Sequence, residues 1–188
     1  MILVTGAGGY IGSILVPLLM KSGYKIRAID RYYFGMHLPP AGNNLEIIQE
    51  DVRKLKPEHF MGVKAVIDLA ALSLDPTNQL LTDVTMEVNH VARVQTATLA
   101  KAAGAKRYVL PASCSVYGKQ NPNVVANENT PVAPLSIYSE SNFLAERDTL
   151  KLADDNFCVV VARQATVFGV APRMRFDIAI NSIEPFNI

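Results

Sequence analysis

The chain has 188 residues, of which 49% are hydrophobic, and its 18 basic and 17 acidic residues leave a formal charge of +1. This length and composition predict one globular domain with a sizeable core and at most a small appendage. The balanced charge, without a Lys/Arg-rich stretch, argues against nucleic acid as a partner. No apolar run approaches the roughly 18 residues that a membrane span requires, and no secretion signal precedes the first strand, so we expect a soluble, cytoplasmic protein.

The chain begins with an apolar run, residues 1–5, that is too short for a helix and is followed by glycines at positions 6, 9 and 12. Apolar residues then recur with helical spacing, which predicts a strand, a turn and a helix. In such a turn Gly6 allows a sharp exit from the strand, Gly9 allows close approach of a pyrophosphate, and Gly12 allows the helix to pack on the sheet. The phosphates would lie at the helix N-terminus.

A second strand, predicted over residues 24–30, ends in Asp30, roughly 20 residues after the glycines, as dinucleotide-binding units require. The glycine spacing is T-G-x-x-G-x-x-G rather than G-x-G-x-x-G. A carboxylate at Asp30 accepts a hydrogen bond from a ribose hydroxyl and repels a 2′-phosphate, which favours NAD. The adjacent Arg31 could neutralise such a phosphate, so NADP remains the alternative.

The rest of the chain alternates apolar strands with helices. Strands are predicted at 45–49, 65–71, 106–110 and 157–162, a long helix at 82–103, a loop at 117–134 and a further helix at 136–153. This alternation predicts an α/β fold with a doubly wound parallel sheet, Rossmann-like, with helices on both faces and ligands outside the carboxyl ends of the strands. Pro17 lies inside the first helix and predicts a kink there.

The two cysteines, Cys114 and Cys158, have no companion cluster of histidines, so we expect no metal site. Their spacing does not exclude a disulfide, although thiols in a chain without a secretion signal are more often reduced. Cys158 stands in the apolar run 157–161 and is predicted to lie in the core.

Taken together, these motifs resemble the extended short-chain dehydrogenase/reductase family, the NAD-dependent epimerase/dehydratase group that acts on nucleotide sugars. The resemblance runs from residue 1 to about residue 181. The motifs that carry it are the glycine turn at 5–12, Asp51-Val52, Leu69-Ala70-Ala71, Asn89, Ser113 to Gly118, Tyr138 and Ala165 to Gly169.

The resemblance implies NAD as the cofactor and a nucleotide sugar as the substrate. The positions that it implies for cofactor binding are Gly6, Gly9, Tyr10, Ile11, Asp30, Arg31, Asp51, Val52, Leu69, Ala70, Ala71, Asn89, Tyr138 and Asn142. Asp51 has an alternative role as a helix cap, which aspartate commonly fills.

The family's chemistry implies Tyr138 as the base that takes a proton from a sugar hydroxyl, with Ser113 binding the same oxygen. Ionising a tyrosine at pH 7 costs about 4 kcal/mol. Family members offset this cost with the charge of the nicotinamide and with a lysine four residues later. Here Asn142 replaces that lysine; it can donate to a ribose hydroxyl but brings no charge. The alternative for Tyr138 is an aromatic side chain that only packs on a helix face.

The reaction subtype can be narrowed by the residues that follow Ser113. Dehydratases of the family carry an Asp-Glu pair there, whereas this chain has Cys114-Ser115, which disfavours dehydration and favours 4-epimerisation or keto-reduction. Cys114 has no basic neighbour in the sequence and is expected to pack rather than react. Arg173 and Arg175 are candidates for contacting the substrate's diphosphate, with a solvated helix start as the alternative.

We assign residues 1–170 to a dinucleotide-binding domain and residues 171–188 to the start of a substrate-binding part that is largely missing by comparison with the family. Two functions follow. The first is an NAD-dependent oxidoreductase or epimerase acting on a nucleotide sugar, and the second is a shortened, non-catalytic NAD-binding module or a fragment of such an enzyme. The resemblance also implies a homodimer formed through the helices around Asn89 and Tyr138.

Overall fold

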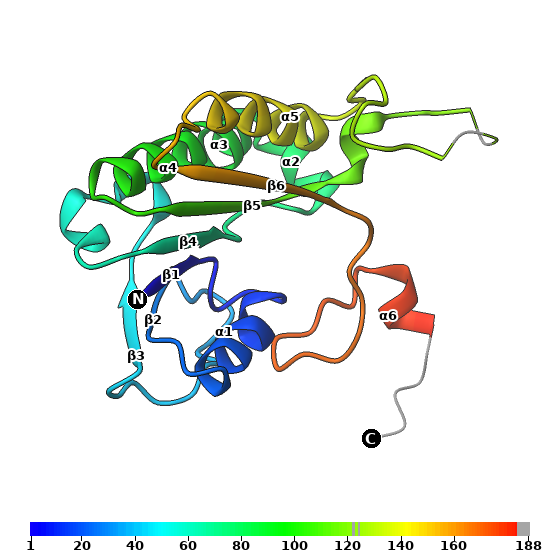
Figure 1. The fold of residues 1–188 in the computed structure, drawn as a ribbon. Helices are drawn as coiled ribbons and strands as arrows, with labels where there is room; N and C mark the ends of the chain where they lie inside the picture. Colours follow the sequence, from blue (N-terminus) through cyan, green and yellow to red (C-terminus); the bar gives the residue numbers. More distant parts are fainter. Residues whose placement is uncertain (122, 124, 184–188) are drawn as a thin grey trace.

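The computed structural model describes residues 1–121, 123 and 125–183, and its centre is one parallel sheet (Figure 1). Its six strands are β1 (Ile2–Thr5), β2 (Ile26–Asp30), β3 (Leu45–Gln49), β4 (Ala65–Asp68), β5 (Arg107–Ser113) and β6 (Cys158–Gln164). They are hydrogen-bonded in the order β3-β2-β1-β4-β5-β6, and every pairing is parallel. The predicted doubly wound parallel sheet is therefore confirmed.

The helices connect these strands. They are α1 (Gly12–Lys21), α2 (Asp75–Leu80), α3 (Thr82–Met86), α4 (Ala92–Ala102), α5 (Ile137–Leu150) and α6 (Ala179–Ile183), with short 3-10 turns at Val52–Lys54, Pro57–Phe60 and Cys114–Tyr117. The long helix predicted at 82–103 is present as α3 and α4 joined by a π-helical turn, Glu87–Val91. Helices α2 and α6 were not predicted from the sequence. Helix α1 continues through Pro17 to Lys21.

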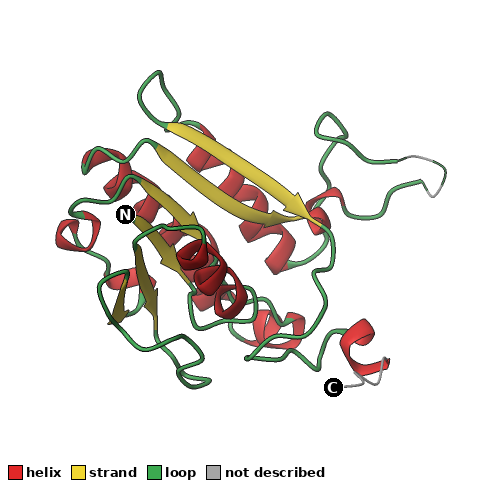
Figure 2. Cartoon of the chain, turned by 60° about the horizontal axis from the view of Figure 1, so that its bottom comes forward, coloured by secondary structure: helices red, strands yellow, loops and turns green. Residues whose placement is uncertain are grey.

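Helices cover both faces of the sheet, as predicted (Figure 2). Because successive side chains of a strand point to opposite faces, the neighbours Leu3 and Val4 belong to different core clusters. Leu3 packs in the cluster that includes Ala97 of α4 and Ala145 of α5, whereas Val4 packs in the cluster that includes Val16 of α1. The two clusters fix α1 on one side and α4 and α5 on the other.

Strand β6 forms one edge of the sheet, and its position corrects the prediction for Cys158. The Cys158 side chain is exposed rather than buried, and so is Val160 on the same side of the strand. Val159 and Val161, on the other side, pack against the core cluster beneath α4 and α5. An apolar run alone does not show that only one face of an edge strand is covered.

The strand order reverses direction between β1 and β4. The chain passes from β1 outward through β2 to β3 on one side, then returns to β4 and continues outward to β6 on the other. In open parallel sheets, ligands bind in the crevice outside the carboxyl ends of the strands at such a switch point. No helix in the described ranges is long and apolar enough to cross a membrane; a cytoplasmic location stays a prediction.

Candidate functional site

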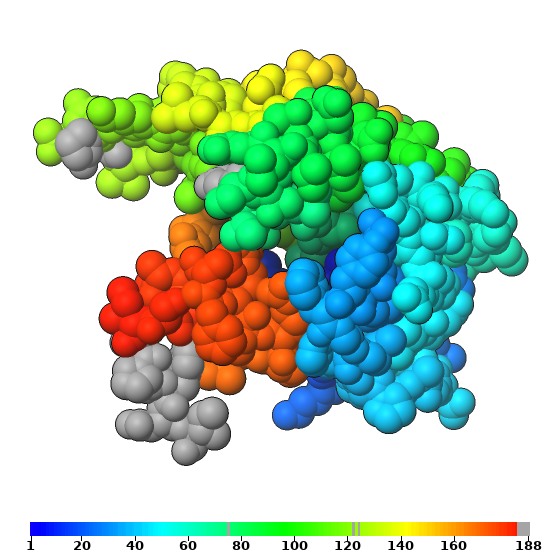
Figure 3. All heavy atoms as spheres, turned by 180° about the vertical axis from the view of Figure 1, so that it is seen from behind, coloured from blue at the N-terminus to red at the C-terminus, as the bar shows by residue number. Residues whose placement is uncertain are grey.

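A cavity of about 680 Å³ lies at this switch point. Figure 3 shows the molecule hollowed between the loop that follows β2, the segment 70–86 and the segment that follows β6. All but two of the predicted site residues line it: Gly6, Gly9, Tyr10, Ile11, Asp30, Arg31, Asp51, Val52, Leu69, Ala70, Ala71, Ser113 and Tyr138. The two exceptions are Asn89 and Asn142. The fold thus brings residues from five strand ends and one helix to a single cavity.

The glycine turn packs backbone against backbone. Gly6 has a φ of +62°, and a Cβ there would come within 2.7 Å of the Ala70 nitrogen, at the end of β4. A Cβ on Gly12 would come within 2.5 Å of the Ala7 carbonyl oxygen and would also collide with that of Gly6. Neither position has room for a side chain.

The turn leaves backbone donors free at the start of α1. Gly9 donates to the Gly6 carbonyl oxygen at 3.1 Å, and Ser13 donates to the Gly9 carbonyl oxygen at 3.0 Å. Within the ranges that the structure describes, the amides of Tyr10 and Ile11 have no hydrogen-bond partner. Unpaired amides at a helix N-terminus, facing a cavity, form an anion-binding arrangement that fits the pyrophosphate of a dinucleotide.

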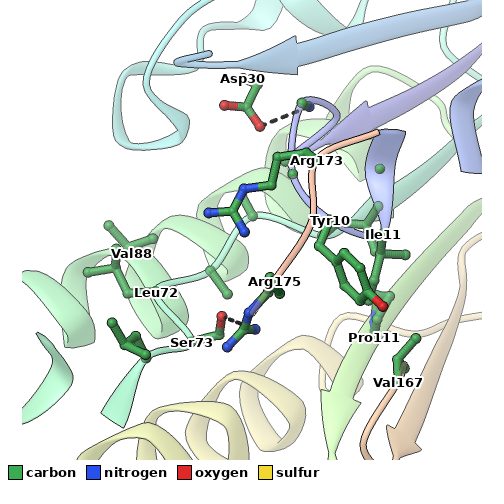
Figure 4. Close-up of a pocket in the computed structure, with 18 of the residues that line it drawn as sticks. Tyr10, Ile11, Asp30, Leu72, Ser73, Val88, Pro111, Val167, Arg173 and Arg175 are labelled. Atoms are coloured by element: carbon green, nitrogen blue, oxygen red, sulfur yellow. Dashed lines mark hydrogen bonds between the residues drawn. The ribbon is translucent and has the colours of Figure 1, made fainter. Parts of the chain in front are cut away.

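Asp30 is held at the edge of the cavity by two backbone donors. Its carboxylate accepts from the amide of Gly8 at 3.1 Å and from the amide of Tyr32 at 2.8 Å (Figure 4). Tyr32 adopts a φ of +52°, and its ring lies over Gly8, where a Cβ would meet it at 2.6 Å. Burial raises the pKa of Tyr32 above its usual value. The Tyr32 hydroxyl stays protonated and donates to the Ala28 carbonyl oxygen at 3.2 Å.

Asp51 has the capping role that the sequence left open. Its carboxylate accepts from the Arg53 amide at 3.0 Å and so caps the 3-10 turn Val52–Lys54. The Arg53 guanidinium also hydrogen-bonds this carboxylate, which lowers the pKa of Asp51 to about 2. Arg31 forms an ion pair with Asp51 at 3.2 Å and stacks over the Tyr33 ring. Arg31 therefore has a carboxylate partner within the protein.

Asn89, in the π-helical turn, does not line the cavity but fixes its wall. It is fully buried, its Oδ1 accepts from the Leu72 amide at 2.8 Å, and its Nδ2 donates to the Leu72 carbonyl oxygen at 2.8 Å. π-Helical turns are frequent at functional sites. Here the turn aims Asn89 at the loop after β4, so the structure gives Asn89 a positioning role.

Ser113 and Tyr138 reach the cavity from different elements. Ser113 is the last residue of β5, and its Oγ accepts from the Ser115 amide at 3.2 Å. Tyr138 lies in the first turn of α5, whose start is capped by Ser136 through the Ser139 amide at 3.2 Å. Cys114, which was expected to pack, is instead exposed and lines the cavity beside Ser113. The two candidate catalytic side chains are thus placed by a strand end and a capped helix start.

Asn142 lies one turn further along α5 and is almost completely buried. Its Nδ2 donates to the Tyr138 carbonyl oxygen at 2.8 Å, and its Oδ1 accepts from Arg93 at 2.9 Å. Arg93, on α4, is itself 3% exposed and lines the cavity. Direct contact between Asn142 and a cofactor stays a prediction, since the side chain faces Arg93 in this structure.

The segment that follows β6 closes one side of the cavity. The Tyr10 hydroxyl donates to the Gly169 carbonyl oxygen at 2.5 Å, and the Asn181 amide donates to the Tyr10 hydroxyl at 3.1 Å. Arg175 donates to the Ser73 Oγ at 2.8 Å, across the cavity in Figure 4, and Arg173 stacks over the Phe34 ring at 4.0 Å. Both arginines line the cavity, and Arg175 also forms an ion pair with Asp177. Contact of the two arginines with a diphosphate stays a prediction.

Residues 2–184 match the sequence profile of the NAD dependent epimerase/dehydratase family. The chain belongs to this family. Among relatives, UDP-glucuronic acid decarboxylase 2 from Arabidopsis thaliana is 32% identical over 188 residues, covering 94% of this chain and 40% of that protein. UDP-glucose 4-epimerase from Mycolicibacterium smegmatis is 31% identical over 158 residues, covering 77% of this chain and 48% of the relative.

A solved structure agrees with the fold. MoeE5 in complex with UDP-glucuronic acid and NAD superposes with a TM-score of 0.81 at 32% identity, covering 96% of this chain and 59% of that one. The chain spans between 40% and 59% of the length of these three proteins.

Sequence reasoning missed several charged residues that line this cavity, among them Arg93. The sequence could have indicated Arg93, because it lies four residues after Asn89 and therefore near it on one helix face. The contact between Arg93 and Asn142 joins residues 49 positions apart and depends on how α4 packs against α5.

Proposed function

We propose that the chain binds NAD in this cavity and that Ser113 and Tyr138 act on a hydroxyl of a sugar carried by a nucleotide diphosphate, in an oxidoreduction or an epimerisation. The observation that carries the proposal is that the glycine turn, Asp30, Ser113 and Tyr138 all line one cavity at the sheet's switch point. Family membership and the NAD and UDP-sugar complexes of MoeE5 support it.

Each group has a role that its position permits. The amides of Tyr10 and Ile11 hold the pyrophosphate, Asp30 accepts from the adenosine ribose, Asp51 and Val52 border the adenine, and the loop at Leu69 to Ala71 borders the middle of the cofactor. NAD, when bound, supplies reversible hydride transfer. Tyr138 takes the proton from the sugar hydroxyl, and Ser113 hydrogen-bonds the same oxygen.

NAD rather than NADP is the proposed cofactor. The Asp30 carboxylate lines the cavity and opposes a 2′-phosphate. Arg31, which could offset that repulsion, is paired with Asp51 at 3.2 Å.

The substrate's diphosphate is proposed to lie against Arg173 and Arg175. Both guanidinium groups line the cavity on the side of the segment that follows β6. Planar guanidinium groups suit phosphate oxygens because they donate in a bidentate geometry. In this view residues 171–183 belong to a substrate-binding part, and residues 184–188 of the predicted part lie outside the described residues.

The test is calorimetry with NAD and NADP, followed by titration of UDP-glucose and UDP-glucuronic acid into the NAD complex. Turnover is then read from the absorbance of the reduced cofactor and from the sugar products. We expect Tyr138→Phe and Ser113→Ala to keep NAD affinity and to lower turnover by about 10²- to 10⁴-fold. Unchanged turnover in Tyr138→Phe would contradict the assigned base.

A second function is favoured by one observation, the asparagine at position 142. Its amide is used in contacts with Tyr138 and Arg93, and it carries no charge. A protein that binds the dinucleotide without turnover is therefore the alternative. It predicts NAD binding in the calorimeter, with no heat from the nucleotide sugars and no product.

A homodimer through the helices around Asn89 and Tyr138, namely the π-helical turn with α4 on one side and α5 on the other, is also proposed. Each of these helical segments exposes an apolar side chain, Val91 in the π-helical turn and Leu150 at the end of α5. The pair of His90 with Asp148 of α5, at 2.8 Å, joins the two segments within one chain. Sedimentation velocity tests this assembly: the twofold pairing predicts a dimer that Val91→Glu dissociates, and a monomeric wild-type chain would contradict it.

A further inference from the structure

Arg93 is a buried cation that pairs with none of the carboxylates that the structure describes. Its residue is 3% exposed, its Nε donates to the Ala70 carbonyl oxygen at 3.1 Å, and its Nη1 donates to the Asn142 Oδ1 at 2.9 Å. Among the side chains that the structure describes, no carboxylate lies within ion-pair distance of Arg93, and the Arg93 Nη2 has no hydrogen-bond partner. Burying an unpaired charge is costly, so such a group calls for a compensating partner.

The two contacts of Arg93 hold the guanidinium at the cavity wall. Asn142 offers its Oδ1 to Arg93 because its Nδ2 is fixed on the Tyr138 carbonyl oxygen at 2.8 Å. Ala70, the other acceptor, belongs to the loop that borders the glycine turn, and its amide donates to the Thr5 hydroxyl at 3.2 Å. Arg93 is therefore fixed between α5 and the end of β4, where it lines the cavity.

Asp68, an acid whose charge interacts with that of Arg93, is engaged by other donors. Asp68, at the end of β4, accepts from the Thr5 hydroxyl and from the Tyr108 hydroxyl, the latter at 2.6 Å. Burial raises the pKa of Asp68, and the charge of Arg93 opposes that rise. The two groups sense each other through space, but Asp68 forms no ion pair with Arg93 and leaves the Nη2 group available.

We propose that Arg93, positioned by Asn142, binds an oxygen of the dinucleotide in the cavity and supplies the positive charge that position 142 lacks. The ligand chemistry is a ribose hydroxyl or phosphate oxygen, because a guanidinium donates to either. This proposal rests on the proposed function, since it takes NAD as the occupant of the cavity. Asn142 is then a positioning residue, and Arg93 is the residue that touches the ligand.

The experiment measures NAD affinity by calorimetry and stability by thermal unfolding without NAD. Arg93→Gln is expected to weaken NAD binding by about 10- to 100-fold, the loss typical of one charge-assisted hydrogen bond. Arg93→Lys is expected to keep part of the affinity. Arg107→Gln, which changes an exposed arginine at the start of β5, is the matched control and should bind NAD like the wild type.

A double variant that moves the positive charge from position 93 to position 142 tests whether the charge itself binds NAD. Asn142→Lys in the Arg93→Gln background returns a cation to the same wall from the other helix, and we expect it to restore most of the lost affinity. A purely structural role for Arg93 predicts no such restoration. If Arg93→Gln does not fold, Asn142→Asp pairs the guanidinium with a carboxylate in an intact chain and should lower NAD affinity more than Asn142→Ala does.

The outcomes separate this inference from the function on which it rests. A wild-type chain that fails to bind NAD overturns the proposed function and, with it, this assignment. A wild type that binds NAD together with a folded Arg93→Gln of equal affinity overturns the assignment alone. Equal affinities of Asn142→Asp and Asn142→Ala would overturn it as well.

Discussion

The Gly8 amide donates to the Asp30 carboxylate across 3.1 Å, and this contact joins the turn after β1 to the end of β2. With the Tyr32 amide at 2.8 Å, it fixes the carboxylate at the edge of the cavity through backbone donors of the protein itself. A pre-positioned acceptor loses little conformational entropy on binding, which favours affinity. Asp30 is thus part of the turn's structure as well as a candidate ligand for the ribose.

Asp30→Asn tests that double role. An asparagine keeps one acceptor oxygen but loses the charge, so we expect NAD affinity to fall about 10-fold and NADP to bind better relative to NAD. Calorimetry with both cofactors measures the change. Asp83→Asn, an exposed substitution on α3, is the control. A preference for NAD as strong as that of the wild type would refute the role of the Asp30 charge in cofactor choice.

Gly12→Ala tests the packing of the glycine turn. The added Cβ would collide with the carbonyl oxygens of Gly6 and Ala7, which are backbone atoms and cannot move independently. We expect a loss of about 1 to 3 kcal/mol in the free energy of unfolding, measured by urea denaturation, together with weaker NAD binding. Gly42→Ala has nothing within 4 Å of the new atom and should change stability by less than about 0.5 kcal/mol.

The pH dependence of stability tests Asp51. Its folded-state pKa of about 2 lies below the value of about 3.9 that an unfolded chain would show. The stabilisation is therefore present above about pH 4 and is lost as the pH falls through about 2. We expect Asp51→Asn to be less stable than the wild type by about 1 to 2 kcal/mol near neutral pH.

That difference in unfolding free energy should shrink steadily as urea titrations are repeated from pH 5 down to pH 2. Asp155→Asn, an exposed carboxylate without an ion pair in the described ranges, serves as the control. If the difference in unfolding free energy between wild type and Asp51→Asn stays constant with pH, the proposed contribution of the lowered Asp51 pKa to stability is contradicted.

Glu146→Gln tests the ion pair that joins α5 to β6. Both oxygens of Glu146 accept from Arg163, whose Nε lies at 2.9 Å, and the Arg163 Nη1 also donates to the Tyr117 hydroxyl at 3.0 Å. Glu146 is 6% exposed, so removing its charge leaves the guanidinium uncompensated. We expect a loss of about 3 kcal/mol by urea denaturation.

Two further variants show whether the loss of stability in Glu146→Gln comes from the ion pair. Glu140→Gln, an exposed change in the first turn of the same helix, should stay within about 0.5 kcal/mol of the wild type. The double variant Glu146→Gln with Arg163→Met should be more stable than Glu146→Gln alone, because it removes the orphaned charge. A double variant that loses the sum of both single changes would speak against an energetic coupling of the pair.

The order of elements and the dinucleotide turn follow from the sequence alone, because they depend on local properties. Glycine spacing, the apolar run before it and an acid at the end of the next strand specify β1, the turn, α1 and β2, and the structure has all of them. The periodicity of the hydrophobic residues likewise predicts the alternation of strands and helices. Ser113 and Tyr138 were identified because they occupy positions of family motifs, and a motif specifies which residue type stands at each position.

The tertiary structure decided what depends on neighbours distant in the chain. Cys158 is exposed because β6 is an edge strand with one covered face, which an apolar run does not reveal. Arg31 follows β2 and Asp51 follows β3, and the two pair because these strands are parallel neighbours in the sheet. The sequence by itself shows that position 142 has no charge; only the packing of α4 against α5 brings Arg93 to it, because helix contacts are set by the whole core.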